Sequence, residues 1–140
     1  MGSADLIFAK ASGAGKAGVS VFRLSGAGAI LVARKLSTSP LRPRYASLTK
    51  IKDPRDGAAI DSGLVILFPG PDSFTGEDVA EFQLHGSLAV EKALYAALQH
   101  EGARPAEPGE FTRRALINGK LDLAQVEGLA DLIDLSLIHI

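Results

Sequence analysis

The sequence predicts an α+β fold with a mainly antiparallel sheet of about five strands and helices packed against it. Two observations support this class. Polar and apolar residues alternate with a period of two at 19–24 and at 79–86, which is typical of half-buried strands. Few helical segments separate the expected strands, which favours hairpin connections over helical crossovers. The length of 140 residues suits one domain with a substantial core.

Five segments are expected to form strands, namely 5–11, 19–24, 45–52, 63–68 and 79–86. The run GLVILF at 63–68 is almost continuously apolar, which is typical of a central strand, and Pro69 ends it. Residues 54–63 read as a turn, and the two prolines of 39–44 predict a loop. The glycine-rich segment 12–18 is expected to connect the first two strands.

Two helices follow from capping signals. Ser25 is a plausible N-cap for a helix through 27–36, where the apolar spacing is helical. Ser87 can cap a second helix that ends at Gly102. Four of its residues are expected to face the core: Leu88, Leu94, Tyr95 and Leu98.

The C-terminal part is expected to hold an extended loop and a short helix that ends at Asn118-Gly119. Asp122 can then cap another helix, with Gln125 in a capping-box position. The apolar stripe of that helix is still without a partner when the sequence ends. We therefore expect two units, a domain at 1–119 and the start of a helical domain at 120–140.

Two nucleotide-binding patterns near the N-terminus lack features that their motifs require. Gly13, Gly15 and Gly18 form G-x-G-x-x-G, but an expected strand follows where the dinucleotide-binding motif needs a helix N-terminus. Gly15-Lys16 resembles the end of a P-loop, but Ala17 stands where Ser or Thr must hold magnesium. A turn between two strands is the better interpretation of this segment.

The strand at 79–86 has a more informative polar face. Glu81, Gln83 and His85 alternate with apolar residues, so a carboxylate, an amide and an imidazole project from one side of the sheet. A solvent-facing strand has the same pattern. The adjacent acidic glycine loop at 74–78 favours a ligand pocket at one end of that face.

Two cations are further candidates for ligand contacts. Arg23 lies on the strand face that also carries valines, where it would either pair with a carboxylate or bind an anionic ligand. Lys120 precedes the expected cap at Asp122, from where its ammonium could reach over a cleft, although a solvated lysine is the ordinary case.

Several function classes receive no support from composition. The sequence has no cysteine, which excludes disulfides, thiol catalysis and cysteine-ligated metals within these residues. The three histidines show no metal-ligand spacing, so no metal site is expected. No apolar stretch approaches a membrane span and no secretory signal begins the sequence, so a cytoplasmic location without membrane contact is the default. No nucleophile stands out either, and we expect no catalytic residue.

Charge is unevenly distributed along the sequence. Residues 1–52 contain nine basic residues and the single acid Asp5, whereas 53–140 contain six basic and fifteen acidic residues. This asymmetry can mark a surface for an anionic partner, but two halves that pack together would explain it equally. The basic residues form no continuous run, so direct binding of nucleic acid is weakly supported.

Four segments together resemble the N-terminal domain of the MnmE (TrmE) family of tRNA-modification GTPases. They occur in family order and at family spacing: GVSVFRLSG, LRPRYASL, LFPGPDSFTGEDVAEFQLHG and ARPAEPGEFTRRALINGKLDLAQVEGLADLID. The second half of the match is highly specific.

The resemblance implies a fold like the folate-binding domain of glycine-cleavage (GcvT-like) aminomethyltransferases. It further implies homodimerisation and binding of 5-formyltetrahydrofolate as a one-carbon carrier, with Arg23, Glu81 and Lys120 as the folate contacts. In the family, a flavin-containing partner and a GTPase domain that uses GTP, Mg and K take part in modifying the wobble uridine of tRNA. The GTPase domain has no counterpart in these residues, so the chain alone is expected to be inactive, and tRNA is expected to bind through the full complex.

Two other hypotheses stay open. The chain can be a purely structural dimerisation module without a ligand, or a stand-alone folate-dependent one-carbon transferase. The sequence also departs from the family pattern, with Ser87 where a second glycine is usual after His85-Gly86, and with an unrelated tail at 135–140.

Overall fold

The computed structural model describes residues 5–11, 18–122 and 124. Within them, six strands and three helices follow one another. The strands are β1 (Ile7–Lys10), β2 (Val19–Ser25), β3 (Ser47–Lys52), β4 (Ala59–Phe68), β5 (Val79–His85) and β6 (Arg104–Pro105). The helices are α1 (Ala29–Leu36), α2 (Leu88–His100) and α3 (Glu110–Ile117).

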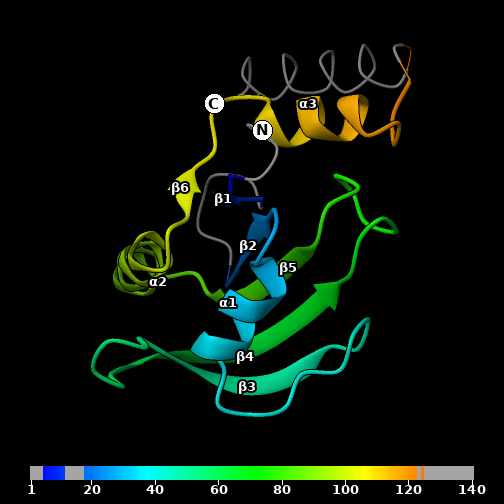
Figure 1. The fold of residues 1–140 in the computed structure, drawn as a ribbon. Coiled ribbons are helices and arrows are strands. Elements are labelled where there is room, and N and C mark those ends of the chain that lie inside the picture. The colour runs from blue at the N-terminus through cyan, green and yellow to red at the C-terminus, as the bar shows by residue number, and fades with distance from the viewer. Residues whose placement is uncertain (1–4, 12–17, 123, 125–140) are drawn as a thin grey trace.

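The strands form one sheet in the order β3-β4-β5-β2-β1-β6 (Figure 1). All neighbouring pairs are antiparallel except β1 and β6, which run parallel. The predicted α+β class with a mainly antiparallel sheet is therefore confirmed. The sixth strand was not predicted, because two residues are too few to show a period.

Helices α1 and α2 cover one face of the sheet (Figure 1). Their buried residues join a core with the inward-facing side chains of the strands, among them Phe22, Leu24, Phe82 and Leu84. The other face presents the polar row of β5, as predicted, and beside it the exposed Val19 and Leu48. The functional candidates therefore stand on the face that these two helices leave open.

The predicted cap at Ser25 is wrong. Ser25 is the last residue of β2 and is fully buried, where its hydroxyl bonds Thr75 and donates to Glu77. Helix α1 begins after Gly28, which has a left-handed φ of 92° and no side-chain cap. The chain turns from strand to helix through Gly26, where an added Cβ would lie 2.6 Å from the carbonyl oxygen of Asp5.

Two other expectations need correction. The predicted turn at 54–63 is too long, since β4 begins at Ala59 and its first residues pair with β3. Leu88 is 64% exposed rather than part of the core, because it occupies the first turn of α2. The other predictions for α2 are confirmed: Ser87 accepts a hydrogen bond from the Val90 amide, and Leu94 and Leu98 are buried.

Parts of the prediction lie outside the described residues. These are the glycine-rich segment at 12–17 and the helix expected after Asp122, with Gln125. The proposed domain boundary at 119–120 stays a prediction. Among the described helices, none is both long and apolar enough to cross a membrane.

Candidate functional site

Arg23 and Glu81 face each other across neighbouring strands. The antiparallel register of β2 and β5 pairs their Cα atoms, and the Arg23 Nε lies 3.2 Å from Glu81 Oε1. The second carboxylate oxygen of Glu81 accepts a hydrogen bond of 2.8 Å from the Gln83 side chain. The structure thus brings together two of the three predicted folate contacts in an ion pair, with Arg23 40% exposed at its side chain and Glu81 13%.

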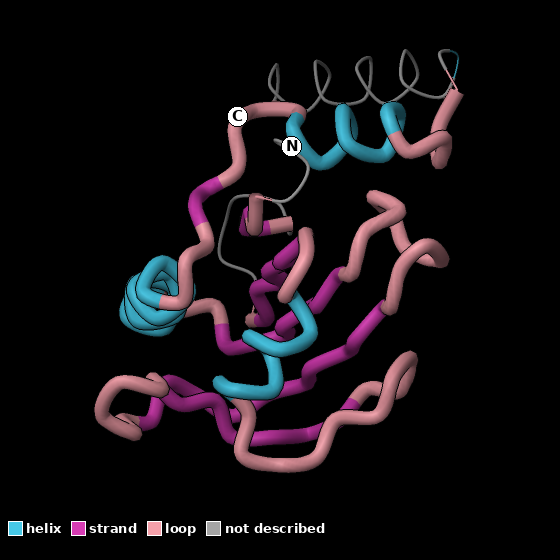
Figure 2. Tube along the Cα trace, viewed as in Figure 1, coloured by secondary structure: helices cyan, strands magenta, loops and turns pink. Residues whose placement is uncertain are grey.

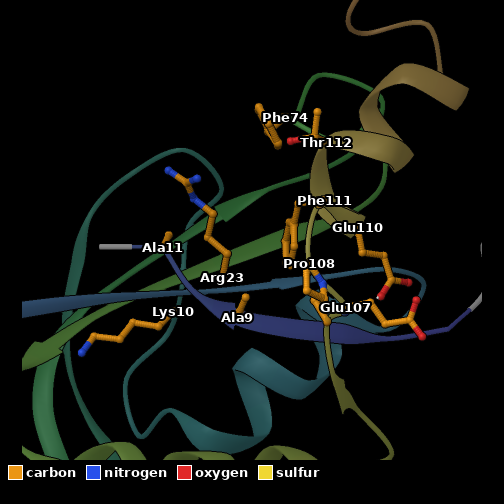
Figure 3. A pocket seen from close by; sticks show the side chains of 12 residues that line it. Ala9, Lys10, Ala11, Arg23, Phe74, Glu107, Pro108, Glu110, Phe111 and Thr112 are labelled. Carbon is orange, nitrogen blue, oxygen red and sulfur yellow. Dashed lines mark hydrogen bonds between the residues drawn. The ribbon is translucent and has the colours of Figure 1, made fainter. Parts of the chain in front are cut away.

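A cavity of about 630 Å³ opens beside Arg23 (Figure 3). This volume falls within the range of small-molecule sites in proteins. The lining comes from four parts of the chain: Ala9, Lys10, Ala11, Arg23, Phe74 and the segment 106–112. In Figure 3, Arg23 stands on one side of the cavity, and Phe111 and Phe74 stand on the other.

The aromatic side of the cavity is formed by a loop and by the first turn of α3. Phe74 belongs to the loop between β4 and β5 and is 41% exposed. Phe111 lies in the first turn of α3, which begins after Gly109 in a left-handed conformation with φ 75°. No periodic pattern of apolar residues marks either phenylalanine in the sequence. The position of Phe74 within a polar, glycine-containing segment was one sign of a ligand contact, because an aromatic side chain in such a loop is not expected to pack in the core.

A buried ion-pair network holds this loop and α3 together. Arg114 of α3 lies 3.0 Å from Glu77 Oε1 and 3.2 Å from Glu110 Oε2, and it donates to the carbonyl oxygen of Asp5 at 2.7 Å. Arg114 is 5% exposed. Its guanidinium therefore connects α3, the loop that carries Phe74 and the chain that enters β1.

Glu110 is the second anchor of this network. Arg104 donates to both of its oxygens, at 2.9 and 2.6 Å, and the Glu107 amide donates to it at 2.9 Å. The hydrogen bonds from Arg104 are the main cause that lowers the pKa of Glu110 to about 2, against the effect of burial. The same contact raises the pKa of Arg104. The Glu110 carboxylate, at this end of the cavity, is therefore charged throughout the physiological pH range.

The third predicted contact, Lys120, lies elsewhere. Its amide donates to the Ala115 carbonyl at 2.8 Å, closing the end of α3. Its Cγ lies 3.5 Å from the point that a Cβ on Gly76 would occupy, so its stem packs beside the loop of Phe74. Lys120 does not line the cavity.

His85 lies at the far end of β5 from the loop of Phe74. The His85 ring Nδ1 is 2.9 Å from Asp61 Oδ1, and the His85 amide donates to Asp61 Oδ2 at 2.8 Å. Burial acts to raise the pKa of Asp61, but these contacts outweigh it and hold the pKa below its usual value. With the His85 side chain 73% exposed, this pair sits on the surface and fixes the end of the strand.

The arrangement suits binding rather than metal chemistry. Within the described part of the chain, no group of three or more metal-ligating side chains comes together. A half-exposed guanidinium and two aromatic rings line the cavity, and the guanidinium pairs with the carboxylate of Glu81, which does not itself line the cavity. Such a site fits a flat, partly anionic organic molecule.

Comparison with known proteins identifies the family that the chain resembles. Residues 6–120 match the family model described as GTP-binding protein TrmE N-terminus. The tRNA modification GTPase MnmE of Beijerinckia indica is 56% identical over 131 residues, which are 93% of this chain and 29% of that protein. The MnmE of Acidiphilium cryptum is 58% identical over 130 residues, or 93% of this chain and 30% of that protein.

A eukaryotic relative is also similar. The mitochondrial 5-taurinomethyluridine-[tRNA] synthase subunit GTPB3 of Danio rerio is 54% identical over 130 residues, which cover 92% of this chain and 26% of that protein. The chain thus spans less than a third of the length of these relatives.

Proposed function

Because its residues 6–120 match the TrmE N-terminus, the chain belongs to the MnmE (TrmE) family of tRNA modification GTPases, and we propose that it binds 5-formyltetrahydrofolate for that modification. The observation that carries this proposal is the position of Arg23, which pairs with Glu81 and also lines the cavity. A folate offers a pterin with amide and amine edges, and carboxylates at its other end. The ion pair of Arg23 and Glu81 is proposed to meet the pterin end.

The carboxylate of Glu81 is proposed to recognise the pterin. Its oxygens already accept one hydrogen bond each, from Arg23 and Gln83. An ionised carboxylate has about four acceptor positions, so two remain for the amide and amine edge of a pterin. Glu81 does not itself line the cavity, but its partner Arg23 does, and bonds from a pterin to the Glu81 carboxylate would be charge-assisted.

Phe74 and Phe111 are proposed to contact the ring system, since aromatic pairs gain from stacked or edge-to-face contact. Arg23 is proposed to contact the pterin end as well, because it lies 3.2 Å from Glu81 and no described side chain accepts from its two terminal nitrogens. Lys120 can meet the ligand only beyond the cavity, since it packs against the loop of Phe74 from outside.

The open face of the sheet is proposed to dimerise. Val19 is 53% exposed and Leu48 is 73% exposed on this face, and neither α1 nor α2 covers them. A second copy of the chain would bury them. Replacing Leu48 by Lys would convert a dimer to a monomer in sedimentation experiments, whereas an unchanged sedimentation coefficient would contradict this surface.

The wider activity is also a proposal. We assign to the full protein, together with a flavin-containing partner, the modification of the wobble uridine of tRNA in the cytoplasm. GTP, with Mg and K, is proposed to act outside residues 6–120. The described site is proposed to supply the one-carbon unit, and the chain alone to have no catalytic turnover.

A purely structural dimerisation module is the second candidate. One observation favours it: Arg23 and Glu81 already satisfy each other as an ion pair, so the fold does not require a ligand. A stand-alone one-carbon transferase is a third candidate, and turnover by this chain alone would be its signature.

Calorimetric titration with 5-formyltetrahydrofolate tests these alternatives. We expect saturable binding by the chain, and a loss of roughly 10- to 100-fold in affinity for Glu81→Gln, because charge-assisted hydrogen bonds are worth about 1.5–3 kcal/mol. Glu101→Gln is the matched control, since Glu101 also pairs with a cation, Lys35, but not at the cavity. Full affinity in Glu81→Gln would contradict the assigned role, and absence of binding by a folded chain would favour the structural module.

A further inference from the structure

Asn118 is the only asparagine of the sequence, and a glycine, Gly119, follows it. Asn118 ends α3 with φ −87° and ψ 10°, and Gly119 continues in a left-handed conformation with φ 72°. Both residues are exposed. Asparagine followed by glycine is the pair most prone to lose its side-chain ammonia, because glycine has no side chain to hinder attack by its nitrogen. The proposed binding of folate makes no use of this pair.

Asn118 also connects α3 to the loop between β4 and β5. Its Nδ2 donates to the Thr75 carbonyl at 2.7 Å, and Thr75 follows Phe74, which lines the cavity. The two segments approach closely, since a Cβ on Gly76 would lie 2.9 Å from Asn118 Cβ. Figure 2 shows this loop beneath the end of α3. The side-chain amide of Asn118 is therefore one of the contacts that hold the Phe74 loop on α3.

The folded backbone keeps the two reacting atoms apart. Deamidation begins when the Gly119 nitrogen attacks Asn118 Cγ, and the five-membered ring requires that nitrogen to be nearly eclipsed with Asn118 Cβ. At ψ 10° it is instead nearly eclipsed with the Asn118 nitrogen. The Gly119 amide also donates to the Leu116 carbonyl at 3.1 Å, while the Asn118 side chain is held by Thr75. Both hydrogen bonds must open before the ring can close.

We propose that Asn118 is a site of spontaneous deamidation whose rate is set by the docking of the Phe74 loop on α3. The Gly119 nitrogen forms a bond to Asn118 Cγ, and the side-chain nitrogen leaves as ammonia. The proton that the Gly119 amide loses passes through water to this leaving group. Water then adds to either carbonyl carbon of the succinimide ring and opens it, which leaves aspartate or isoaspartate at this position.

Both products lack the donor that the Thr75 carbonyl accepts from. A carboxylate at this position faces that carbonyl as acceptor against acceptor, which leaves the carbonyl without its partner. It also adds a negative charge to a small hollow that Asn118 lines together with Glu77 and Asp78. Deamidation therefore loosens the loop that carries Phe74. Its effect on the ligand rests on the proposed binding of folate.

Peptide mapping of the 140-residue chain, kept at mildly alkaline pH and sampled over time, measures the rate. Trypsin cuts after Arg114 and Lys120, so Asn118 lies in one short peptide whose aspartate and isoaspartate forms separate by chromatography. Deamidation should be roughly 10- to 100-fold slower in the folded chain than in denaturing urea, because two hydrogen bonds must open. Equal rates in the two states, or no deamidation in either, would overturn the proposal.

Gly76→Ala tests the docking, because its Cβ pushes against Asn118 and should raise the rate in the folded chain roughly tenfold. Gly102→Ala is the matched control, since φ is 95° there and 81° at Gly76, but nothing lies within 4 Å of its Cβ position. It should leave the rate unchanged. Urea below the unfolding transition gives a second measurement: local opening predicts a constant rate, and a rate that rises with global unfolding would contradict the role of docking.

Calorimetry measures the effect on the cavity separately. Asn118→Asp should bind 5-formyltetrahydrofolate roughly tenfold more weakly than the parent chain, because it lacks the donor to Thr75. Gln99→Glu makes the same change from amide to carboxylate at an exposed position of α2 and should leave the affinity unchanged. Equal affinities of both variants would refute the link to the cavity. Absence of binding by the parent chain would count against the folate site instead, since the deamidation rates are measured without ligand.

Discussion

The ion pair between Arg114 and Glu77 joins the third helix to the loop that precedes β5. The two side chains meet at 3.0 Å and are only 6% and 11% exposed. Phe111 lies on the same helix as Arg114, and Phe74 on the same loop as Glu77, so this pair holds both aromatic walls of the cavity. The stability of the fold and the shape of the site therefore depend on the same contact.

Replacing Arg114 by Leu should destabilise the fold by about 3–5 kcal/mol. The substitution leaves Glu77 without its ion-pair partner in a buried position, and this loss is of the size measured for single partners of buried pairs. Urea unfolding measures the change. The neighbouring Arg113, whose side chain is 55% exposed, is the control, and Arg113→Leu should change the free energy of unfolding by less than about 0.5 kcal/mol. Equal effects of both variants would contradict the network.

Glu110 should make the fold sensitive to acid. Its pKa is about 2 in the folded chain and 4.5 as the ordinary value, so the folded state keeps it charged where the unfolded state protonates it. The stability from this group is fully present above the ordinary pKa and is lost as the pH falls from 4.5 towards 2.

Urea unfolding at a series of pH values tests this dependence. The free energy of unfolding should fall over that acidic interval, and Glu110→Gln should flatten the fall. Glu107→Gln serves as the control, because the Glu107 side chain is 70% exposed. A pH dependence that Glu110→Gln leaves unchanged would refute the role of Glu110.

Ser25 and Ser87 should respond differently to replacement by Ala. Ser25 is fully buried between Thr75 and Glu77, so Ser25→Ala should cost about 1–3 kcal/mol. Ser87 caps α2 through a long hydrogen bond of 3.4 Å, so Ser87→Ala should cost about 0.5 kcal/mol. Thermal unfolding of both variants measures the difference, and the reverse order of stability would contradict these roles.

Gly63 should not tolerate a side chain. A Cβ there would lie 2.2 Å from the Gln83 carbonyl oxygen of the neighbouring strand. Gly63→Ala should therefore force β4 and β5 apart and destabilise the fold by about 3 kcal/mol or more. Gly18→Ala is the control, since nothing lies within 4 Å of its Cβ position. Equal unfolding midpoints for both variants would contradict the close approach of the strands.

Long, regular elements could be predicted from the sequence, and short or irregular ones could not. The alternation in β2 and β5 and the cap of α2 at Ser87 were visible because they depend on local patterns. Strand β6 and the start of β4 depend on pairing with distant residues, which no local pattern records. The local pattern predicts a cap at Ser25 wrongly, because the burial of Ser25 against Glu77 is a tertiary contact that the pattern does not contain.

The site residues also divide into those that local patterns indicate and those that only the tertiary structure positions. Arg23 and Glu81 could be singled out because each is a charge in an ordered strand pattern, and their pairing follows from the strand register. The aromatic wall of Phe74 and Phe111 could not be singled out, since Phe74 lies on a loop without a period and Phe111 lies in the first turn of the short helix α3. The distance of Lys120 from the cavity depends on the path of the chain after α3, which spacing alone does not define.

The parallel pairing of β6 with β1 has a consequence for how the chain folds as it is made. Strands β1 and β2 pair as neighbours in sequence, and so do β3, β4 and β5. The other edge of β2 must wait for β5, and the other edge of β1 must wait for Arg104. Such distant pairings slow folding, because a long loop must close before any contact forms. During synthesis, β1 therefore keeps an open edge until residue 104 has left the ribosome. The two-residue strand is then the step that completes the sheet.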